Sequence, residues 1–151
     1  SAPTLSQVRC GGDGVAPGTV VSDAMLLHPK VCAADLSVAA AHELFGDDHV
    51  HALLVVGAGV LLAVVEQADL AGAPAEAPAR HHGRLGDRVV GPHEDMLATW
   101  TAMLADGRRR LAVVDGQGAL LGLLCLKRSG RGFCSQADVD ARARERGALA
   151  P

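Results

Sequence analysis

An apolar hairpin pattern occurs twice along the chain, and this repeat limits the accessible folds more than any other feature. In the first copy, the apolar run 51–56 is followed by a turn containing Gly59 and a second run, 61–65. In the second copy, the runs 110–115 and 120–124 flank another glycine. Two apolar runs joined by a short glycine-containing turn are typical of a β-hairpin with a buried face. The repeat therefore predicts two similar units, each built around one hairpin.

A helix is expected before each hairpin. The first spans about 36–45, with Asp35 or Ser37 near its N-cap and Gly46 after its end. The second spans about 94–105. Acidic residues are expected in its first turn, and Gly107 follows it. The helical spacing predicts these apolar faces: Leu36, Ala39, Ala40 and Leu44 in the first helix, and Met96, Trp100, Met103 and Leu104 in the second.

The remaining elements complete two units of the same order. An upstream strand is expected at 21–25 and again at 85–89, and a short helix at 67–70 follows the first hairpin. Each unit is then strand, helix, strand, strand, short helix. Units this small bury too little surface to be stable alone, so the two are expected to pack against each other.

These patterns divide the chain of 151 residues into five parts. The Ala/Pro-rich stretch between the units lacks apolar periodicity and is expected to be a semi-extended, solvated tether that includes His81 and His82. Ser135 and Asp138 predict a capping box at the start of a tail helix. The predicted parts are a flexible leader (1–19), unit 1 (20–72), the linker (73–83), unit 2 (84–128) and the tail (129–151).

Composition narrows the class of protein. Apolar residues make up 49% and charged residues 21%, which is typical of a globular chain. A formal net charge of −3 argues against nucleic acid as a partner. The sequence has no apolar run long enough to span a membrane and no signal-peptide pattern at its start, so a cytoplasmic protein without a membrane partner is expected.

The sequence predicts neither a metal site nor an enzyme. The four cysteines include no CxxC pair, and Cys125 and Cys134 are too far apart in sequence for a zinc knuckle. The chain has no GxSxG elbow, Walker loop or HExxH motif. His42 and Glu43 lie in the middle of a predicted helix without a third catalytic partner. We therefore expect no catalytic residues and no metal ligands.

Residues 20–128 resemble a tandem pair of CBS (cystathionine-β-synthase-type) domains, known as a Bateman module. The resemblance rests on Val21-x-Asp23-x-Met25, the first hairpin, Asp69-Leu70 and the second copy of this order. It implies an α/β (α+β) fold in which two β-α-β-β-α units pack through their sheets about a pseudo-twofold axis and leave two clefts. Such modules regulate enzymes, channels or transporters, commonly as dimers, and their clefts often bind AMP, ATP or S-adenosylmethionine.

The resemblance also implies site residues in the first cleft. Asp69 stands at the position of the family's ribose-binding acid, and Glu66 stands where a hydroxyl residue normally helps to hold phosphate. A carboxylate there repels phosphate, and residues 20–70 carry one lysine against seven acids, a charge of −6. Adenosine or S-adenosylmethionine is therefore favoured over ATP. The alternative is that Asp69 only caps a turn or helix.

In the second cleft, Cys125 replaces the hydroxyl residue and Arg128 replaces the ribose-binding acid. Residues 84–128 carry seven basic groups against five acids, a charge of +2. These basic groups either converge on an anion or, as we favour, pair with the acidic first copy of a neighbouring subunit. His51 is expected to make a polar contact beside the cleft. The remaining ligand-binding candidates are Arg110 and the apolar Leu27 and Leu53, because adenine slots between apolar side chains.

These inferences lead to the hypothesis of a stand-alone regulatory CBS pair. It would require no cofactor and would bind an adenosine-type ligand (AMP, ATP or S-adenosylmethionine), a regulated protein partner, or both. A homodimer is expected, in which Arg108 and Arg110 contact Asp47 or Asp48 of the second subunit. The alternative is a structural dimerisation module whose clefts bind no ligand.

Overall fold

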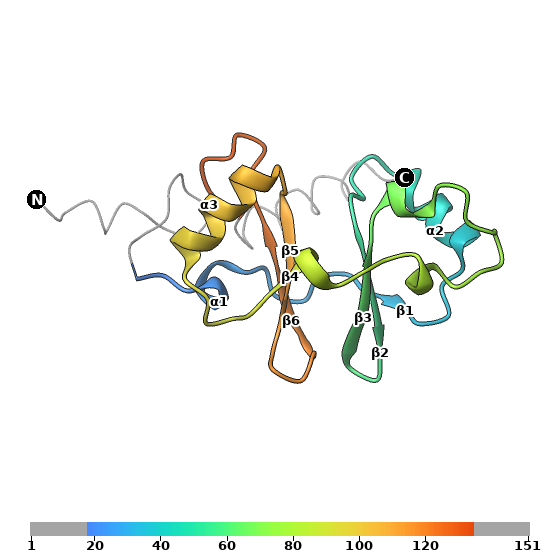
Figure 1. Cartoon of the computed structure of the whole chain (residues 1–151), viewed down its shortest axis with the longest axis horizontal. Helices are drawn as coiled ribbons and strands as arrows, with labels where there is room; N and C mark the ends of the chain where they lie inside the picture. Colours follow the sequence, from blue (N-terminus) through green and yellow to red (C-terminus); the bar gives the residue numbers. More distant parts are fainter. Residues whose placement is uncertain (1–17, 135–151) are drawn as a thin grey trace, which may run out of the picture.

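Two three-stranded sheets lie side by side in the computed structural model, which describes residues 18–134 (Figure 1). The predictions for the leader before residue 18 and for the tail helix after residue 134 lie outside these residues. The first sheet contains β1 (Cys32–Ala33), β2 (Leu53–Gly57) and β3 (Val60–Val65), and the second contains β4 (Val89–Val90), β5 (Arg110–Val114) and β6 (Leu120–Cys125). In each sheet the first strand is parallel to the second, which forms an antiparallel hairpin with the third. Both predicted hairpins are confirmed.

Both helices begin about two residues later than predicted, each directly after a capping residue, so the acidic residues expected in the first turn of the second helix precede it. α2 (Val38–Phe45) is capped by Ser37, whose side chain accepts a hydrogen bond from the Ala40 N–H, and α3 (Met96–Asp106) is capped in the same way by Asp95. Gly107 ends α3 in the left-handed conformation with φ 67°, which a glycine adopts without strain. The short helix predicted at 67–70 is the 3₁₀ turn η2 (Gln67–Leu70).

The strand expected at residues 21–25 is wrong, because this stretch forms the short helix α1 (Val21–Ala24). Val21 and Ala24 lie three positions apart, so a helical turn buries both side chains on one face. The first strand of the unit is instead β1, eight residues after α1. In the second unit, the strand expected at 85–89 is also mostly wrong, because Gly86–Arg88 form the 3₁₀ turn η4 and β4 begins only at Val89.

The predicted buried face of the first helix is also wrong. α2 buries Val38, Ala41 and Phe45, whereas Leu44 is 40% exposed. Nearly all of this helix is apolar, so its sequence pattern does not define one face, and the helix buries its bulky Val38 and Phe45. In α3 the prediction holds for Met96 and Met103, but Leu104 is 50% exposed.

The start of each unit pairs with the hairpin of the other unit. Leu26 exchanges two backbone hydrogen bonds with Leu123 in β6 (2.7 and 3.0 Å), and Arg84 exchanges two with Val64 in β3 (3.0 and 3.1 Å). Both contacts need a glycine. A Cβ on Gly122 would lie 2.6 Å from the Leu26 carbonyl oxygen, and one on Gly83 would lie 2.7 Å from that of Val64. This reciprocal exchange links the two units and was not predicted from the sequence.

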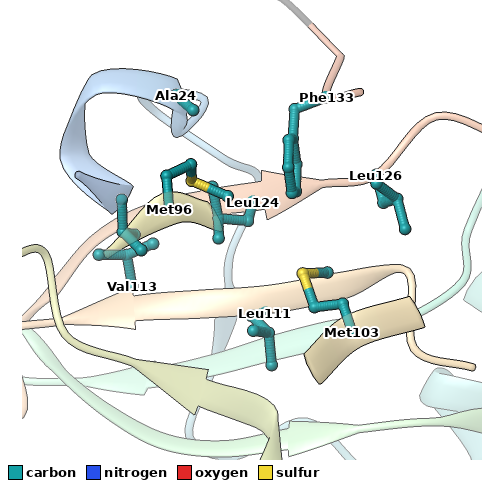
Figure 2. Packing of buried hydrophobic residues seen from close by; sticks show 9 residues of the cluster. Ala24, Met96, Met103, Leu111, Val113, Leu124, Leu126 and Phe133 are labelled. Atoms are coloured by element: carbon teal, nitrogen blue, oxygen red, sulfur yellow. The ribbon is translucent and has the colours of Figure 1, made fainter. Parts of the chain in front are cut away.

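The exchange determines which residues share a core. Figure 2 shows Ala24 beside Met96, in the cluster that fills the second unit. The first core takes in Ala79 from η3 (Ala79–His81), although this residue lies in the segment expected to be a linker. The buried members of the second core are Val21, Ala24, Met96, Met103, Leu111, Val113, Leu124, Leu126 and Phe133.

The Ala/Pro-rich segment is not a solvated tether, and that expectation is wrong. Its backbone accepts hydrogen bonds from the start of α2, with Val38 N–H donating to the Ala77 oxygen (2.8 Å) and Ala39 N–H to the Ala75 oxygen (3.0 Å). Ala79 N–H donates back to the Leu36 oxygen (2.8 Å), and the Ala79 side chain is fully buried. Alanine side chains are small enough to let the backbones approach this closely.

The two sheets meet through a third apolar cluster, drawn from matching positions of the two repeats. Leu54 of β2 and Ala112 of β5 both belong to it, as do Leu61 of β3 and Leu120 of β6. Leu61 N–H also donates to the Gly118 oxygen across the contact (2.9 Å). The predicted packing of the units through their sheets is therefore confirmed. Within residues 18–134, no helix is long and apolar enough to cross a membrane.

Candidate functional site

A pocket of about 320 Å³ lies where the two units meet. It is at the end of the sheets opposite the hairpin turns, because β2 and β5 begin there and β3 ends there. Both units therefore contribute to its wall. The lining residues are His51, Ala52 and Glu66 from the first unit, and Asp106, Gly107, Arg108, Arg109 and Arg110 from the second.

Three consecutive arginines give the pocket its chemistry. Arg108 forms an ion pair with Glu66 of the first unit (3.3 Å), which links the two units, and another with Asp87 of its own unit (2.7 Å). Arg109 donates from Nη2 to the Leu126 carbonyl oxygen (3.2 Å). The Nε atoms of both residues are buried and have no hydrogen-bond partner in the described part of the chain. Burial lowers the pKa of Arg110, which nevertheless stays charged because an arginine pKa is so high. This part of the wall therefore carries three positive charges.

His51 lies at the edge of this arginine group. Burial lowers the pKa of His51, and the positive charges of Arg110, Arg109 and Arg128 lower it further. The imidazole is therefore mostly neutral at pH 7. An anion bound beside these arginines would offset their charge and raise the pKa of His51 towards its usual value.

Asp69 lies in an ion pair beside the pocket and is absent from its lining. Arg88, only 3% exposed, donates from Nη1 to Asp69 Oδ2 (2.6 Å) and from Nη2 to Oδ1 (3.0 Å). The Glu66 N–H also donates to Oδ2 (2.7 Å), so Asp69 caps the η2 turn. Burial alone would raise the pKa of Asp69, but the hydrogen bonds from Arg88 and Glu66 hold it below its usual range.

Arg88 is the residue that the sequence analysis missed. Besides Asp69, it donates to the Val64 carbonyl oxygen (2.7 Å) and forms an ion pair with Glu66 (3.2 Å). Its only sequence signal is a charged side chain directly before a strand, which normally indicates a solvated position. Its burial follows from the exchanged segment, which carries it onto β3 of the other unit.

The other predicted site residues are divided between several places. The pocket brings His51, Glu66 and Arg110 together. Leu53 is 6% exposed inside the first core, whereas Leu27 is 50% exposed and Arg128 is also exposed, so none of the three lines the pocket. Within residues 18–134, no group of three or more His, Cys, Asp or Glu side chains is arranged to hold a metal ion.

Cys125 is outside the pocket lining but lies near two of the arginines that form it. The positive charge of Arg110 acts on the thiol of Cys125, whose Sγ lies 3.3 Å from that of Cys134.

Comparison with known proteins assigns the family. The family model of the CBS domain matches residues 21–76. Residues 21–76 are a CBS domain. No curated protein sequence matches it. The structure of CBSX2 in complex with AMP matches with a TM-score of 0.60 and 25% identity, over 85% of this chain and 99% of that chain. The exchanged, twofold-like arrangement described above is thus that of a CBS pair.

Two further structures agree in fold. A CBS domain pair/ACT domain protein from Thermotoga maritima matches with a TM-score of 0.55 and 18% identity, over 87% of this chain and 100% of that chain. The CBS domains of a transcriptional regulator from Streptococcus pneumoniae match with a TM-score of 0.58 and 16% identity, over 82% of this chain and 98% of that chain. The predicted CBS pair and its fold class are confirmed.

Proposed function

We propose that this CBS pair is a regulatory module that works by binding rather than catalysis, and that its pocket takes an adenosine-type ligand with an anionic group. The observation that carries the proposal is the run Arg108–Arg109–Arg110 in a pocket lined by both units. A ligand there contacts both units, so binding is coupled to their relative position. The AMP complex of a structure that is 25% identical supports the choice of ligand class.

The pocket's charges favour a ligand with one phosphate over a triphosphate. Three guanidinium groups face two carboxylates, those of Glu66 and Asp106. Because Glu66 already holds Arg108, the phosphate is expected to face Arg109 and Arg110. A volume of about 320 Å³ is at the small end of the range for small-molecule pockets and suits AMP better than ATP.

Asp69 enters this proposal in a different role from the one that the family resemblance implied. Its two oxygens already accept hydrogen bonds from Arg88 and Glu66, so a ribose would have to displace a buried ion pair. We therefore propose that Asp69 positions Arg88 and the η2 turn, and that the arginines supply the main ligand contacts.

Isothermal titration calorimetry with AMP, adenosine, ATP and S-adenosylmethionine tests the proposal. AMP is expected to bind more tightly than adenosine, with an affinity that falls as salt is added. Arg109→Gln and Arg110→Gln should each weaken AMP binding at least tenfold, whereas Arg80→Gln, an exposed arginine outside the pocket, should not. Equal binding of AMP and adenosine, or no binding by any of the four, would contradict the proposal.

A second candidate function is a structural module that only dimerises. It is favoured by exposed leucines on the outer helices, where Leu44 is 40%, Leu97 46% and Leu104 50% exposed. The predicted contact of Arg108 with Asp47 or Asp48 of a partner has lost support, because Arg108 already pairs with Glu66 and Asp87 of its own chain. Light scattering during gel filtration at low and high salt separates the cases. A dimer unaffected by salt, together with no ligand binding, would favour this second function.

A further inference from the structure

Cys125 and Cys134 face each other across a short antiparallel pair that follows β6. The chain turns back after Leu126, which pairs with Phe133. Cys134 N–H donates to the Cys125 carbonyl oxygen (2.7 Å), and Lys127 N–H donates to the Gly132 oxygen (2.8 Å). The two sulfur atoms are 3.3 Å apart. Residues nine apart in the sequence thus place their thiols in contact.

The backbone already has the geometry that a disulfide needs. Directly opposed residues of an antiparallel pair have Cα atoms roughly 4.5–5.5 Å apart. A disulfide spans Cα separations of roughly 4.4–6.8 Å, with a sulfur–sulfur bond of about 2.05 Å. The thiols can therefore close by rotation of their side chains, with no change in how the strands pair.

The two thiols differ in access and in their neighbours. Cys134 is 3% exposed, whereas Cys125 is partly exposed and lies near the positive charge of Arg110. The hydrogen bond with Cys134 and burial raise the pKa of Cys125. The positive charges of Arg110 and Arg109 oppose this rise. The pair is therefore mostly protonated at neutral pH, and the arginines stabilise the thiolate that forms on Cys125.

We propose that Cys125 and Cys134 are a redox-responsive dithiol that closes to an intramolecular disulfide by exchange with a small-molecule disulfide such as oxidised glutathione. The Cys125 thiol loses its proton, and its thiolate attacks one sulfur of the reagent. The reagent's sulfur–sulfur bond breaks, and one thiol leaves with the electron pair and takes up a proton. Cys134 then loses its proton, attacks the Cys125 sulfur and displaces the second thiol. Two protein thiols are oxidised and one reagent disulfide is reduced to two thiols.

The disulfide would hold residues 125–134 in place, and this segment contacts Arg109 of the pocket wall. Arg109 donates to the Leu126 oxygen at the start of this segment (3.2 Å), and Trp100 Nε1 donates to the Gly130 oxygen in its turn (2.8 Å). Trp100 is the only tryptophan in the chain, so the fluorescence comes from one side chain that contacts this segment. The proposal rests on these contacts and does not require a ligand in the pocket.

The test uses the full chain carrying Cys10→Ser and Cys32→Ser, so that only this pair of cysteines remains. After incubation with oxidised glutathione, we expect a monomer-mass chain without adduct that has lost the two thiol hydrogens. Its melting temperature should rise by roughly 5–10 °C, and Trp100 emission should change. Dithiothreitol should reverse all three effects. A peptide map of the oxidised wild-type chain gives the same answer if the double variant does not fold.

Cys134→Ser in the same background is the matched control. It lacks the resolving thiol, so it should keep one glutathione on Cys125 and show no rise in melting temperature. The proposal is overturned if the protein with both cysteines also stops at a stable adduct, links to a second chain, or does not react.

Discussion

Asp69→Asn is the substitution that most directly tests the role assigned to the Arg88 ion pair. The variant keeps the size of the side chain and removes its charge. Arg88 is only 3% exposed, and its two Nη atoms donate to the two Asp69 oxygens at 2.6 and 3.0 Å. An asparagine can accept only one of these bonds, and its amide nitrogen would face a guanidinium donor.

The expected loss of stability can be worked out from these contacts. Breaking a buried ion pair by removing one partner costs about 3–5 kcal/mol, because the other charge stays buried. Arg88 keeps the Val64 oxygen at 2.7 Å and Glu66 at 3.2 Å, which lowers this cost. We expect a decrease of about 2–4 kcal/mol in the free energy of unfolding, or a drop of roughly 5–15 °C in melting temperature.

Urea unfolding at several pH values measures the effect and its sign. The pKa of Asp69 is lowered in the folded state, so the unfolded chain takes up a proton first as the pH falls. The stabilisation is therefore complete above the unfolded pKa of about 3.9 and is lost as the pH falls through the folded value. The difference between wild type and Asp69→Asn should be constant at neutral pH and shrink below about pH 4.

Arg88→Met is the control for the pairing itself. It removes the buried charge, and the Asp69 carboxylate, whose side chain is 12% exposed, can still cap the η2 turn. Asp69→Asn should therefore cost much less in the Arg88→Met background than in the wild type. A loss below about 0.5 kcal/mol for Asp69→Asn in the wild type, or equal losses in both backgrounds, would refute a structural role for the pair.

Two further predictions concern the fold. Gly122→Ala should destabilise the chain by about 1–3 kcal/mol, since the new Cβ would lie 2.6 Å from the Leu26 oxygen, whereas Gly116→Ala, with nothing within 4 Å, should be almost neutral in the same urea experiment. Phe45→Ala should cost about 3–5 kcal/mol and Leu44→Ala under about 1, because α2 buries the former and exposes the latter; a reversed order in thermal unfolding would contradict the observed face of this helix.

The features predicted correctly from the sequence are those that short-range patterns determine. The hairpins follow from apolar runs around glycine, and the starts of α2 and α3 follow from capping residues such as Ser37. These signals lie within a few residues of the structure they specify, so they can be recognised in a single sequence. The family resemblance then supplied the pairing of the two units, which no local pattern contains.

The errors lie where contacts between distant segments decide the structure. The face of α2 cannot be chosen from the run Val38–Phe45, because apolar side chains surround most of the helix. The segment around Ala79 has a linker's composition, but the first core needs its small side chain. Arginine usually lies at the surface, and the burial of Arg88 depends on Val64 and Asp69, which belong to the other unit. These site residues could not be found without the exchange of segments.

The same exchange explains why the two repeats are not equivalent as binding sites. Leu26 and Arg84 occupy matching positions, since each pairs with the third strand of the opposite unit, and the residue four places later is Lys30 in one copy and Arg88 in the other. The position matching Asp69 holds Arg128, so the second copy has two cations where the first has an ion pair. Both of these cations are exposed and cannot attract each other. In the first copy, Asp69 is therefore neutralised within the fold. The positive charge that is not neutralised belongs to the second copy, which also contributes Arg108–Arg110 to the shared pocket.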